Sequence, residues 1–146
     1  MSELTFRNLQ ADDLSKIANL DKDIFPDFWT ETMWRSEYER GDFFGFVATM
    51  DEDITGYICG TALFEEGELP KVAVKKEYRG LGIGSKLVDC LLKHMQGKGV
   101  EKVFLEVRVS NVAALALYTM KGFEKLRERK KYYPDGEDAL ELFKNL

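Results

Sequence analysis

The sequence has few of the residue types that build metal centres and hydrolytic sites. Its 146 residues include one histidine and two cysteines. A catalytic zinc ion takes three protein ligands, often histidines or cysteines, and a Ser-His-Asp triad requires a histidine beside the serine. His94 falls on the polar side of an expected helix, a position typical of a surface residue. We therefore expect neither a zinc enzyme nor a serine hydrolase, and no metal site.

The sequence also lacks targeting segments. No run approaches the roughly 20 apolar residues that span a bilayer. The first stretch, MSELTFRNLQADD, has no basic region followed by an apolar one. Cys59 and Cys90 lie in apolar segments and form no ligand cluster, as expected of reduced core thiols. We expect a cytoplasmic protein with no membrane partner.

Acidic residues outnumber basic ones. A formal net charge of −5 and a pI near 5.0 disfavour nucleic acid as a partner, because nucleic-acid-binding surfaces are usually basic. One basic run, KLRERKKYY at 125–133, departs from this balance. Strand alternation predicts a solvated face for the run, and contact with an anionic ligand tail or with a partner is the alternative.

Hydrophobic periodicity predicts a single domain, 1–146, without repeats, low-complexity tracts or linkers. The expected elements follow the order β-α-α-β-β-β-α-β-α-β-β, with antiparallel hairpins on both sides of a central β-α-β unit. Asp12 or Asp13 is the expected cap of the first helix, and Thr30 that of the second. Pro70 lies in an expected strand and, because it lacks an N–H, predicts a bulge or an unpaired side. We expect an α/β protein with a mixed sheet and helices on both faces.

Three glycines, Gly80, Gly82 and Gly84, stand where the apolar pattern of a helix begins, although glycine weakens helices. A glycine loop between a strand and a helix can bind an anion. The first N–H groups of a helix lack partners, and the missing Cβ atoms let a phosphate approach. Tight packing of the helix on the strand is the alternative. The order Ser85-Lys86 does not fit a Walker A loop, and position 85 holds no glycine for a dinucleotide fingerprint.

The spacing of Arg79, Gly82 and Gly84 fits Arg/Gln-x-x-Gly-x-Gly/Ala and resembles the acetyl-CoA signature of the GNAT acetyltransferase superfamily. The resemblance implies that loop amides hold the pyrophosphate of coenzyme A and that the strand VAV pairs with its pantetheine arm. It also implies the GNAT fold, a mostly antiparallel sheet of about seven strands with a splayed, bulged central strand. With the motifs below, the implied acetyl-CoA contacts are Val72, Ala73, Val74, Arg79, Gly80, Leu81, Gly82, Ile83, Gly84, Ser85, Asn111 and Tyr118.

Two later stretches narrow the resemblance. LEVRVSNVAALALYTMKGF (105–123) and KKYYPDGEDALEL (130–142) are similar to segments of RimI-type protein N-terminal alanine acetyltransferases. Together with the glycine motif, the resemblance covers about half of the chain, 69–143. It implies an acceptor α-amine on a protein or peptide N-terminus. The implied substrate is the N-terminal alanine of a small ribosomal subunit protein.

The N-terminal half departs from the family pattern. In IFPDFWTETMW, Asp27 and Phe28 separate Pro26 from Trp29, whereas the family element is F-P-W-S. Pro70 replaces another residue in the strand that faces the acceptor. Both departures bear on the choice of substrate, and neither touches the cofactor motif.

Glu106 is the expected general base. Strand alternation places Phe104, Glu106 and Arg108 on one face, so the residues alone allow either a base or a structural partner of Arg108. The RimI-type resemblance implies the role of base, because the matching glutamate has it in that group.

Tyr118 is the expected general acid, and Asn111 an expected cofactor contact. Periodicity alone places Tyr118 on one helical face with Ala114 and Leu115, which is typical of a core residue. Asn111 precedes the same helix, which is typical of an N-cap. The resemblance implies in addition that the tyrosine lies near the thioester sulfur and that the asparagine touches the cofactor.

Acetyl transfer requires a neutral amine, which favours an N-terminus over a lysine. An α-amine has a pKa of about 8 and a lysine amine one of about 10.4, a difference of about 3 kcal/mol in deprotonation. We therefore expect direct transfer to an N-terminal amine with one carboxylate as base. The same chemistry on a lysine or a small-molecule amine is one alternative. A non-catalytic module that senses acyl-CoA is the other.

Overall fold

The computed structural model describes residues 3–146, which form the expected order of elements. The four α-helices are α1 (Leu14–Ile24), α2 (Glu31–Tyr38), α3 (Ile83–Gly97) and α4 (Val112–Met120). The seven strands are β1 (Leu4–Asn8), β2 (Phe43–Met50), β3 (Asp53–Leu63), β4 (Glu66–Val74), β5 (Lys102–Arg108), β6 (Glu124–Arg129) and β7 (Ala139–Asn145). None of these helices is long and apolar enough to cross a membrane.

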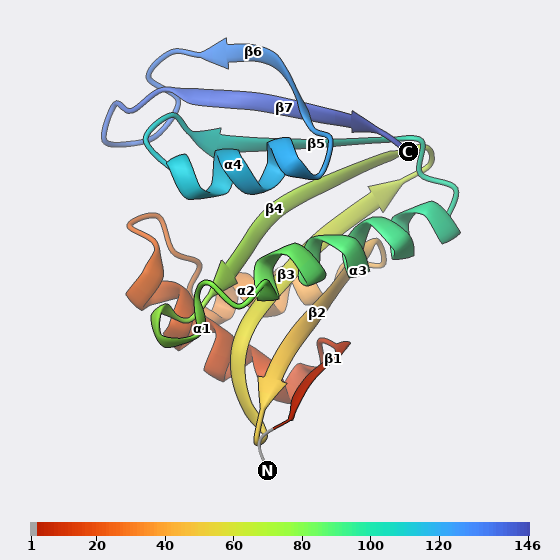
Figure 1. Cartoon of the computed structure of the whole chain (residues 1–146), viewed down its shortest axis with the longest axis vertical. Coiled ribbons are helices and arrows are strands. Elements are labelled where there is room, and N and C mark those ends of the chain that lie inside the picture. The colour runs from red at the N-terminus through yellow and green to blue at the C-terminus, as the bar shows by residue number, and fades with distance from the viewer. Residues whose placement is uncertain (1–2) are drawn as a thin grey trace.

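The strands form one sheet in the order β1-β2-β3-β4-β5-β7-β6 (Figure 1). Every neighbouring pair is antiparallel except β4 and β5, which are parallel. Parallel neighbours require a crossover, and α3 supplies it. The predicted β-α-β unit between antiparallel hairpins is therefore confirmed.

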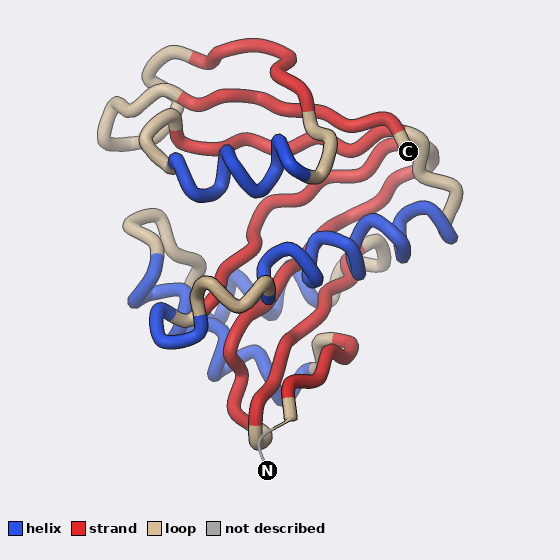
Figure 2. The backbone as a smooth tube through the Cα atoms, in the orientation of Figure 1, coloured by secondary structure: helices blue, strands red, loops and turns tan. Residues whose placement is uncertain are grey.

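Helices cover both faces of the sheet, as predicted (Figure 2). On one face, α3 lays an apolar stripe of four residues spaced four apart against the sheet, each no more than 1% exposed: Ile83, Leu87, Leu91 and Met95. The side chains of β5 and α4 join this core. On the other face, α1 and α2 pack Ile17 and Trp34 against Tyr57 of β3. Burial of these stripes fixes α3 and α1 relative to the middle of the sheet.

The sheet splits between its two central strands. β4 pairs with β5 only where Glu66–Glu68 faces Lys102–Phe104, and beyond this the strands diverge. The register of β4 with β3 shifts at the same place. Lys71 faces Cys59 and Glu68 faces Thr61, so β4 has one more residue than β3 between these two pairs. Pro70 lies within this shift. The predicted bulge at Pro70 is confirmed, and it coincides with the point of divergence.

Several local predictions are confirmed by the hydrogen bonds. Thr30 caps α2 by accepting from the N–H of Met33 at 3.2 Å, and Asn111 caps α4 by accepting from the N–H of Ala114 at 3.2 Å. The basic run also lies in solvent along β6, although the strand ends at Arg129 and the rest of the run is a turn.

Two other local predictions hold only in part or not at all. Asp13 is the N-cap of α1, as predicted, but its carboxylate binds Arg7 and the N–H of Gln10 instead of the helix N–H groups. His94 is half-buried rather than a surface residue, with its ring 4.5 Å from that of Phe44. In both cases a neighbouring strand supplies a partner that periodicity along one helix cannot reveal.

Candidate active site

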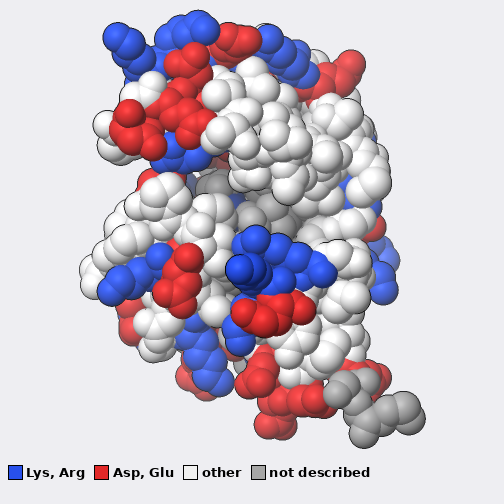
Figure 3. Space-filling model, turned by 60° about the vertical axis from the view of Figure 1, so that its left-hand side comes forward, with Lys and Arg blue, Asp and Glu red and all other residues white. Residues whose placement is uncertain are grey.

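The divergence of β4 and β5 opens a cleft. Figure 3 turns its open side towards the viewer and shows the surface hollowed between the part built on β5–β7 and the part built on β1–β4. A groove of about 580 Å³ runs between β4, the start of α3 and the start of α4. A smaller cavity of about 90 Å³ adjoins it between Pro70–Val72 and Glu106–Arg108. The two share several lining residues, including Val72 and Asn111.

Most of the predicted cofactor contacts line this cleft. The groove is lined by Val72, Ala73, Val74, Arg79, Gly84 and Asn111. Tyr118 and Glu106 line the adjoining cavity. Gly80, Leu81, Gly82 and Ser85 do not line the groove but belong to the loop and first helical turn that carry Gly84. The side chain of Ile83 is buried in the core, so only its backbone can face a ligand.

The glycine loop presents the N-terminus of α3 to the groove. Gly82 is the N-cap of α3 and has a φ of 79°, in the left-handed region that favours glycine. The first helical hydrogen bond runs from the N–H of Lys86 to the carbonyl of Gly82 at 3.1 Å. The N–H groups before Lys86 therefore have no intrahelical acceptor and carry the positive end of the helix dipole. This end of the helix suits an anion.

Tight packing does not explain the three glycines. A Cβ at Gly80 or Gly82 would meet no atom within 4 Å, so their positive φ angles are what favour glycine there. A Cβ at Gly84 would approach no atom closer than 3.5 Å, the distance to Leu117 Cδ2. Gly84 has no positive φ, and a Cβ there would make only ordinary contacts with Leu117 and Val74 beside the groove.

Glu106 is the more basic of two glutamates that face each other across neighbouring strands. It is paired in register with Glu141 of β7, and its side chain is 37% exposed. Burial and the charge of Glu141 raise the pKa of Glu106. Burial alone would raise the pKa of Glu141 too, but hydrogen bonds from Arg129 and Arg127 lower it. The pKa of Glu106 is raised and that of Glu141 is lowered, so Glu106 is the better base of the pair.

The tyrosine of the cavity has a free hydroxyl. Tyr118 is 6% exposed and packs edge-to-face on Phe123, so it is a core residue as well as a cavity residue. Within residues 3–146 its hydroxyl has no hydrogen-bond partner, and Trp34 Nε1 is the only enclosed side-chain nitrogen or oxygen in that range without one. The Tyr118 hydroxyl therefore opens into the cavity. Burial raises its pKa well above the ordinary value, so it keeps its proton at neutral pH.

A buried charge network forms the floor of the cavity. Lys71, which lines the cavity, donates to Asp21 at 2.5 Å. Asp21 is fully buried and also accepts from the Tyr57 hydroxyl at 2.6 Å and the N–H of Trp29 at 2.7 Å. The ring of Phe25 lies 4.5 Å from Lys71 Nζ. The network thus holds the segment between α1 and α2 against β3 and β4.

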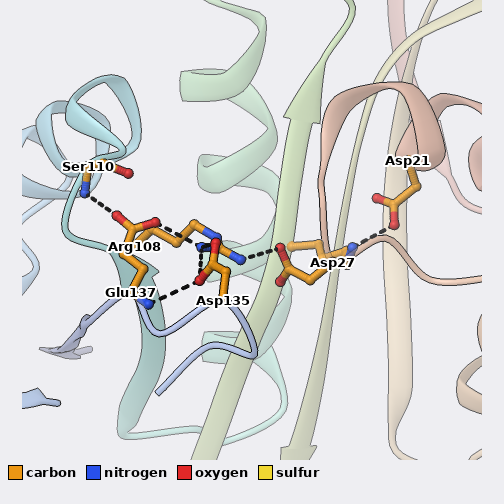
Figure 4. Close-up of polar contacts among 7 residues, drawn as sticks. Asp21, Asp27, Arg108, Ser110, Asp135 and Glu137 are labelled. Atoms are coloured by element: carbon orange, nitrogen blue, oxygen red, sulfur yellow. Dashed lines mark hydrogen bonds and ion pairs between the residues drawn. The ribbon is translucent and has the colours of Figure 1, made fainter. Parts of the chain in front are cut away.

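The sequence did not predict a group of charged residues that bridges the two sides of the cleft at its open side. Arg108 pairs with Asp27 at 3.1 Å, Asp135 at 2.9 Å and Glu137 at 2.8 Å (Figure 4). The ring of Tyr133 lies 4.0 Å from the guanidinium carbon. Arg108 therefore does not serve as the partner of Glu106. The signals that could have pointed here were the inserted Asp27 and the position of Arg108 on the face of Glu106.

Comparisons with known proteins agree with this geometry. Residues 14–123 match the acetyltransferase (GNAT) family. An N-alpha-acetyltransferase of Saccharolobus solfataricus is 32% identical over 94% of this chain and 90% of its own length. The ribosomal protein bS18 alanine N-acetyltransferase of Escherichia coli is 31% identical over 93% of each protein. A crystal structure of the Escherichia coli ribosomal-protein-S18-alanine N-acetyltransferase superposes with a TM-score of 0.91 at 29% identity, over 98% of this chain and 94% of that one.

The buried network should be essential for stability. Lys71→Met leaves the Asp21 carboxylate without its cation, and we expect a loss of about 3–5 kcal/mol in the free energy of unfolding, measured by urea denaturation. The double variant Lys71→Met/Asp21→Asn should lose less than the single variants add up to, because it removes both charges. Lys125→Met breaks an exposed pair with Glu128 and should change little. A Lys71→Met protein as stable as Lys125→Met would contradict the role of the network.

Proposed function

Because the chain belongs to the GNAT family of acetyltransferases, we propose that it acetylates the α-amine of a protein or peptide N-terminus. The observation that carries the proposal is the meeting of the groove and the cavity beside Glu106 and Tyr118. A donor held in the groove and an acceptor amine in the cavity would meet beside a base and an acid. Bringing both substrates together in one orientation removes much of the entropic cost of a reaction between two molecules.

The donor is acetyl-CoA, which supplies an acetyl thioester. The free N–H groups of the loop 80–85 suit its pyrophosphate, and Arg79 stands beside them. Arg79 Nε donates to the carbonyl of Val74 at 3.0 Å, which ties the loop to the end of β4. The edge of β4 beyond Glu68 has no partner in β5, so the backbone of 72–74 is free to pair with the pantetheine arm. Asn111 lines both the groove and the cavity and can contact the arm there.

Glu106 and Tyr118 each take part in one of the proton transfers that the reaction requires. The ammonium of the acceptor must lose one proton before its nitrogen can attack, and Glu106 accepts it directly or through water. The nitrogen then forms a bond to the acetyl carbon while the carbon–sulfur bond breaks. The second amine proton leaves to solvent. The Tyr118 hydroxyl donates a proton to the departing thiolate and regains one from solvent. Its raised pKa keeps the hydroxyl protonated, so it is available as a donor at neutral pH.

The relatives make an N-terminal amine the favoured acceptor. Both curated relatives described above are named for N-terminal acetylation, and the Escherichia coli enzyme is named for ribosomal protein bS18. A ribosomal protein is therefore our candidate substrate. One glutamate suits an α-amine, whose pKa lies about 2.4 units below that of lysine.

A panel of amines tests the acceptor. We expect acetyl-CoA and this protein to modify peptides at their N-terminal amine, with an alanine-first peptide among the fastest. Mass spectrometry should report the site of the acetyl group on each peptide. Peptides with a blocked N-terminus and a free lysine, and polyamines, serve as controls. Faster modification of either control would replace the proposed acceptor, and thiol release with no amine would favour the sensing module.

Substitutions of the two cavity residues test the mechanism. Glu106→Gln and Tyr118→Phe should each lower kcat by about 100-fold or more, with acetyl-CoA affinity retained. The Tyr118 hydroxyl has no partner in the described chain, so its removal breaks no internal hydrogen bond and should leave the melting temperature unchanged. Tyr132→Phe, at an exposed neighbouring tyrosine, is the matched control. Wild-type turnover in both test variants would contradict the assignment of Glu106 as the base and Tyr118 as the acid.

A substitution in the loop tests the donor site. Gly84→Leu places its Cβ at an ordinary contact distance of 3.5 Å from Leu117, and the rest of its side chain would occupy the groove. We expect acetyl-CoA affinity to fall about tenfold or more, as when hydrogen bonds to a charged group are lost. Gly97→Leu, at the other end of α3, places its Cβ where nothing lies within 4 Å and is the control. If calorimetry finds equal acetyl-CoA affinity in the two variants, the proposal that acetyl-CoA binds in this groove is wrong.

A further inference from the structure

Arg108 joins three segments that are distant in sequence. Its Nη2 donates to Asp27 between α1 and α2, whereas its Nη1 donates to Asp135 and Glu137 between β6 and β7. Each terminal nitrogen of the guanidinium therefore serves one loop. Figure 4 shows the side chain between the two loops, with carboxylates on both sides. The side chain of Arg108 is only 15% exposed, although three of its partners are acidic loop residues.

The charges on these loops would repel each other without Arg108. Asp27 belongs to one side of the cleft, and Asp135 and Glu137 belong to the other. Glu137 also accepts from the N–H of Ser110, so the loop between β6 and β7 is fixed to the start of α4. Arg108 and Asp27 then form a direct ion pair across the open side of the cleft. A planar guanidinium can bind both loops at once, which a single ammonium does less well.

The two loops carry opposite walls of the cavity. Phe25 lies two residues before Asp27 and lines the cavity from the side of α1. Tyr133 stacks on the Arg108 guanidinium and lines the cavity from the side of β7. A change in the Arg108–Asp27 distance would change the separation of these two walls. Glu106 lies two residues before Arg108 on the same strand, so the walls are set relative to the base.

We propose that Arg108, through its pair with Asp27, is a positioning residue that fixes the width of the acceptor cavity. The proposal rests on the proposed function in that the cavity receives the amine. Arg108 acts on acceptor binding and does not exchange a proton with it. Asp27 is also one of the two residues inserted relative to the F-P-W-S element of the family. The cavity width that it sets would therefore contribute to the acceptor preference of this chain.

Steady-state kinetics of Asp27→Asn, Arg108→Gln and the double variant test the role. Asp27→Asn should raise the KM of the acceptor about fivefold, as expected for the loss of a partly exposed ion pair, with kcat and acetyl-CoA affinity unchanged. In the Arg108→Gln background the same substitution should have no further effect, because the pair is already broken. Arg108→Lys should restore part of the acceptor affinity lost in Arg108→Gln. Asp89→Asn is the matched control, since it breaks the Lys121–Asp89 pair between α4 and α3.

The outcomes separate positioning from other roles. An Asp27→Asn enzyme that matches Asp89→Asn in acceptor KM, or additive effects in the double variant, would overturn the proposal. Weaker acetyl-CoA binding with an unchanged acceptor KM would assign Arg108 to the donor instead. The kinetics use whichever amine of the panel is modified fastest. A lysine or a polyamine as the best acceptor would therefore refute the proposed N-terminal substrate while the KM and kcat values still decide the role of Arg108.

Discussion

The short pairing of β4 with β5 is the constraint from which the site follows. Three residues of each strand are in register, and then a bulge that contains Pro70 turns β4 away. A parallel sheet with complete pairing would leave no edge for a ligand and no gap between strands. The crossover helix α3 starts at the open end of β4, and α4 starts at the open end of β5. Divergence therefore brings two helix starts and two strand ends to one cleft.

The difference in pKa between Glu106 and Glu141 depends on arginines of β6, a strand outside the cleft. If Glu106 and Glu141 were isolated as a pair, their charges would repel each other and one of the two would gain a proton easily. Arg127 and Arg129 project from the outermost strand β6 and hold Glu141 in its ionised form. The basic run along β6 thus lies in solvent, as the sequence indicates, and also sets the electrostatic surroundings of Glu106. Part of the effect passes through Glu141 of β7, and part is direct, because Arg129 Nε lies 3.9 Å from a carboxylate oxygen of Glu106.

Features encoded over a few neighbouring residues could be predicted from the sequence. The apolar stripe of α3, the caps Thr30 and Asn111, and the bulge at Pro70 each depend on local spacing or on one residue's chemistry. Contacts between elements could not be predicted in this way. Asp13 takes the predicted cap position, but its carboxylate binds Arg7 of β1, and His94 is half-buried because its ring packs on Phe44 of β2.

Long-range polar contacts in the site could not be predicted in the same way. Arg108 and Asp27 are 81 positions apart, and nothing in the local pattern of either residue indicates the other. The roles of Glu106 and Tyr118 came from a family resemblance, since strand alternation and helical periodicity left each with a purely structural alternative. The structure brings both residues to one cavity, which neither pattern could specify.

An open strand edge in the middle of a sheet also carries a risk. Unpaired peptide groups can recruit a strand from another copy of the chain, and natural sheets protect such edges with bulges and prolines. β4 has both devices where its free edge begins, because Pro70 offers no N–H and the bulge disturbs the regular spacing. The bulge that leaves room for a narrow, flexible ligand thus also makes it harder for a β-strand of another copy to pair with this edge. Replacing Pro70 would affect not only the shape of the cleft but also the tendency of the protein to self-associate.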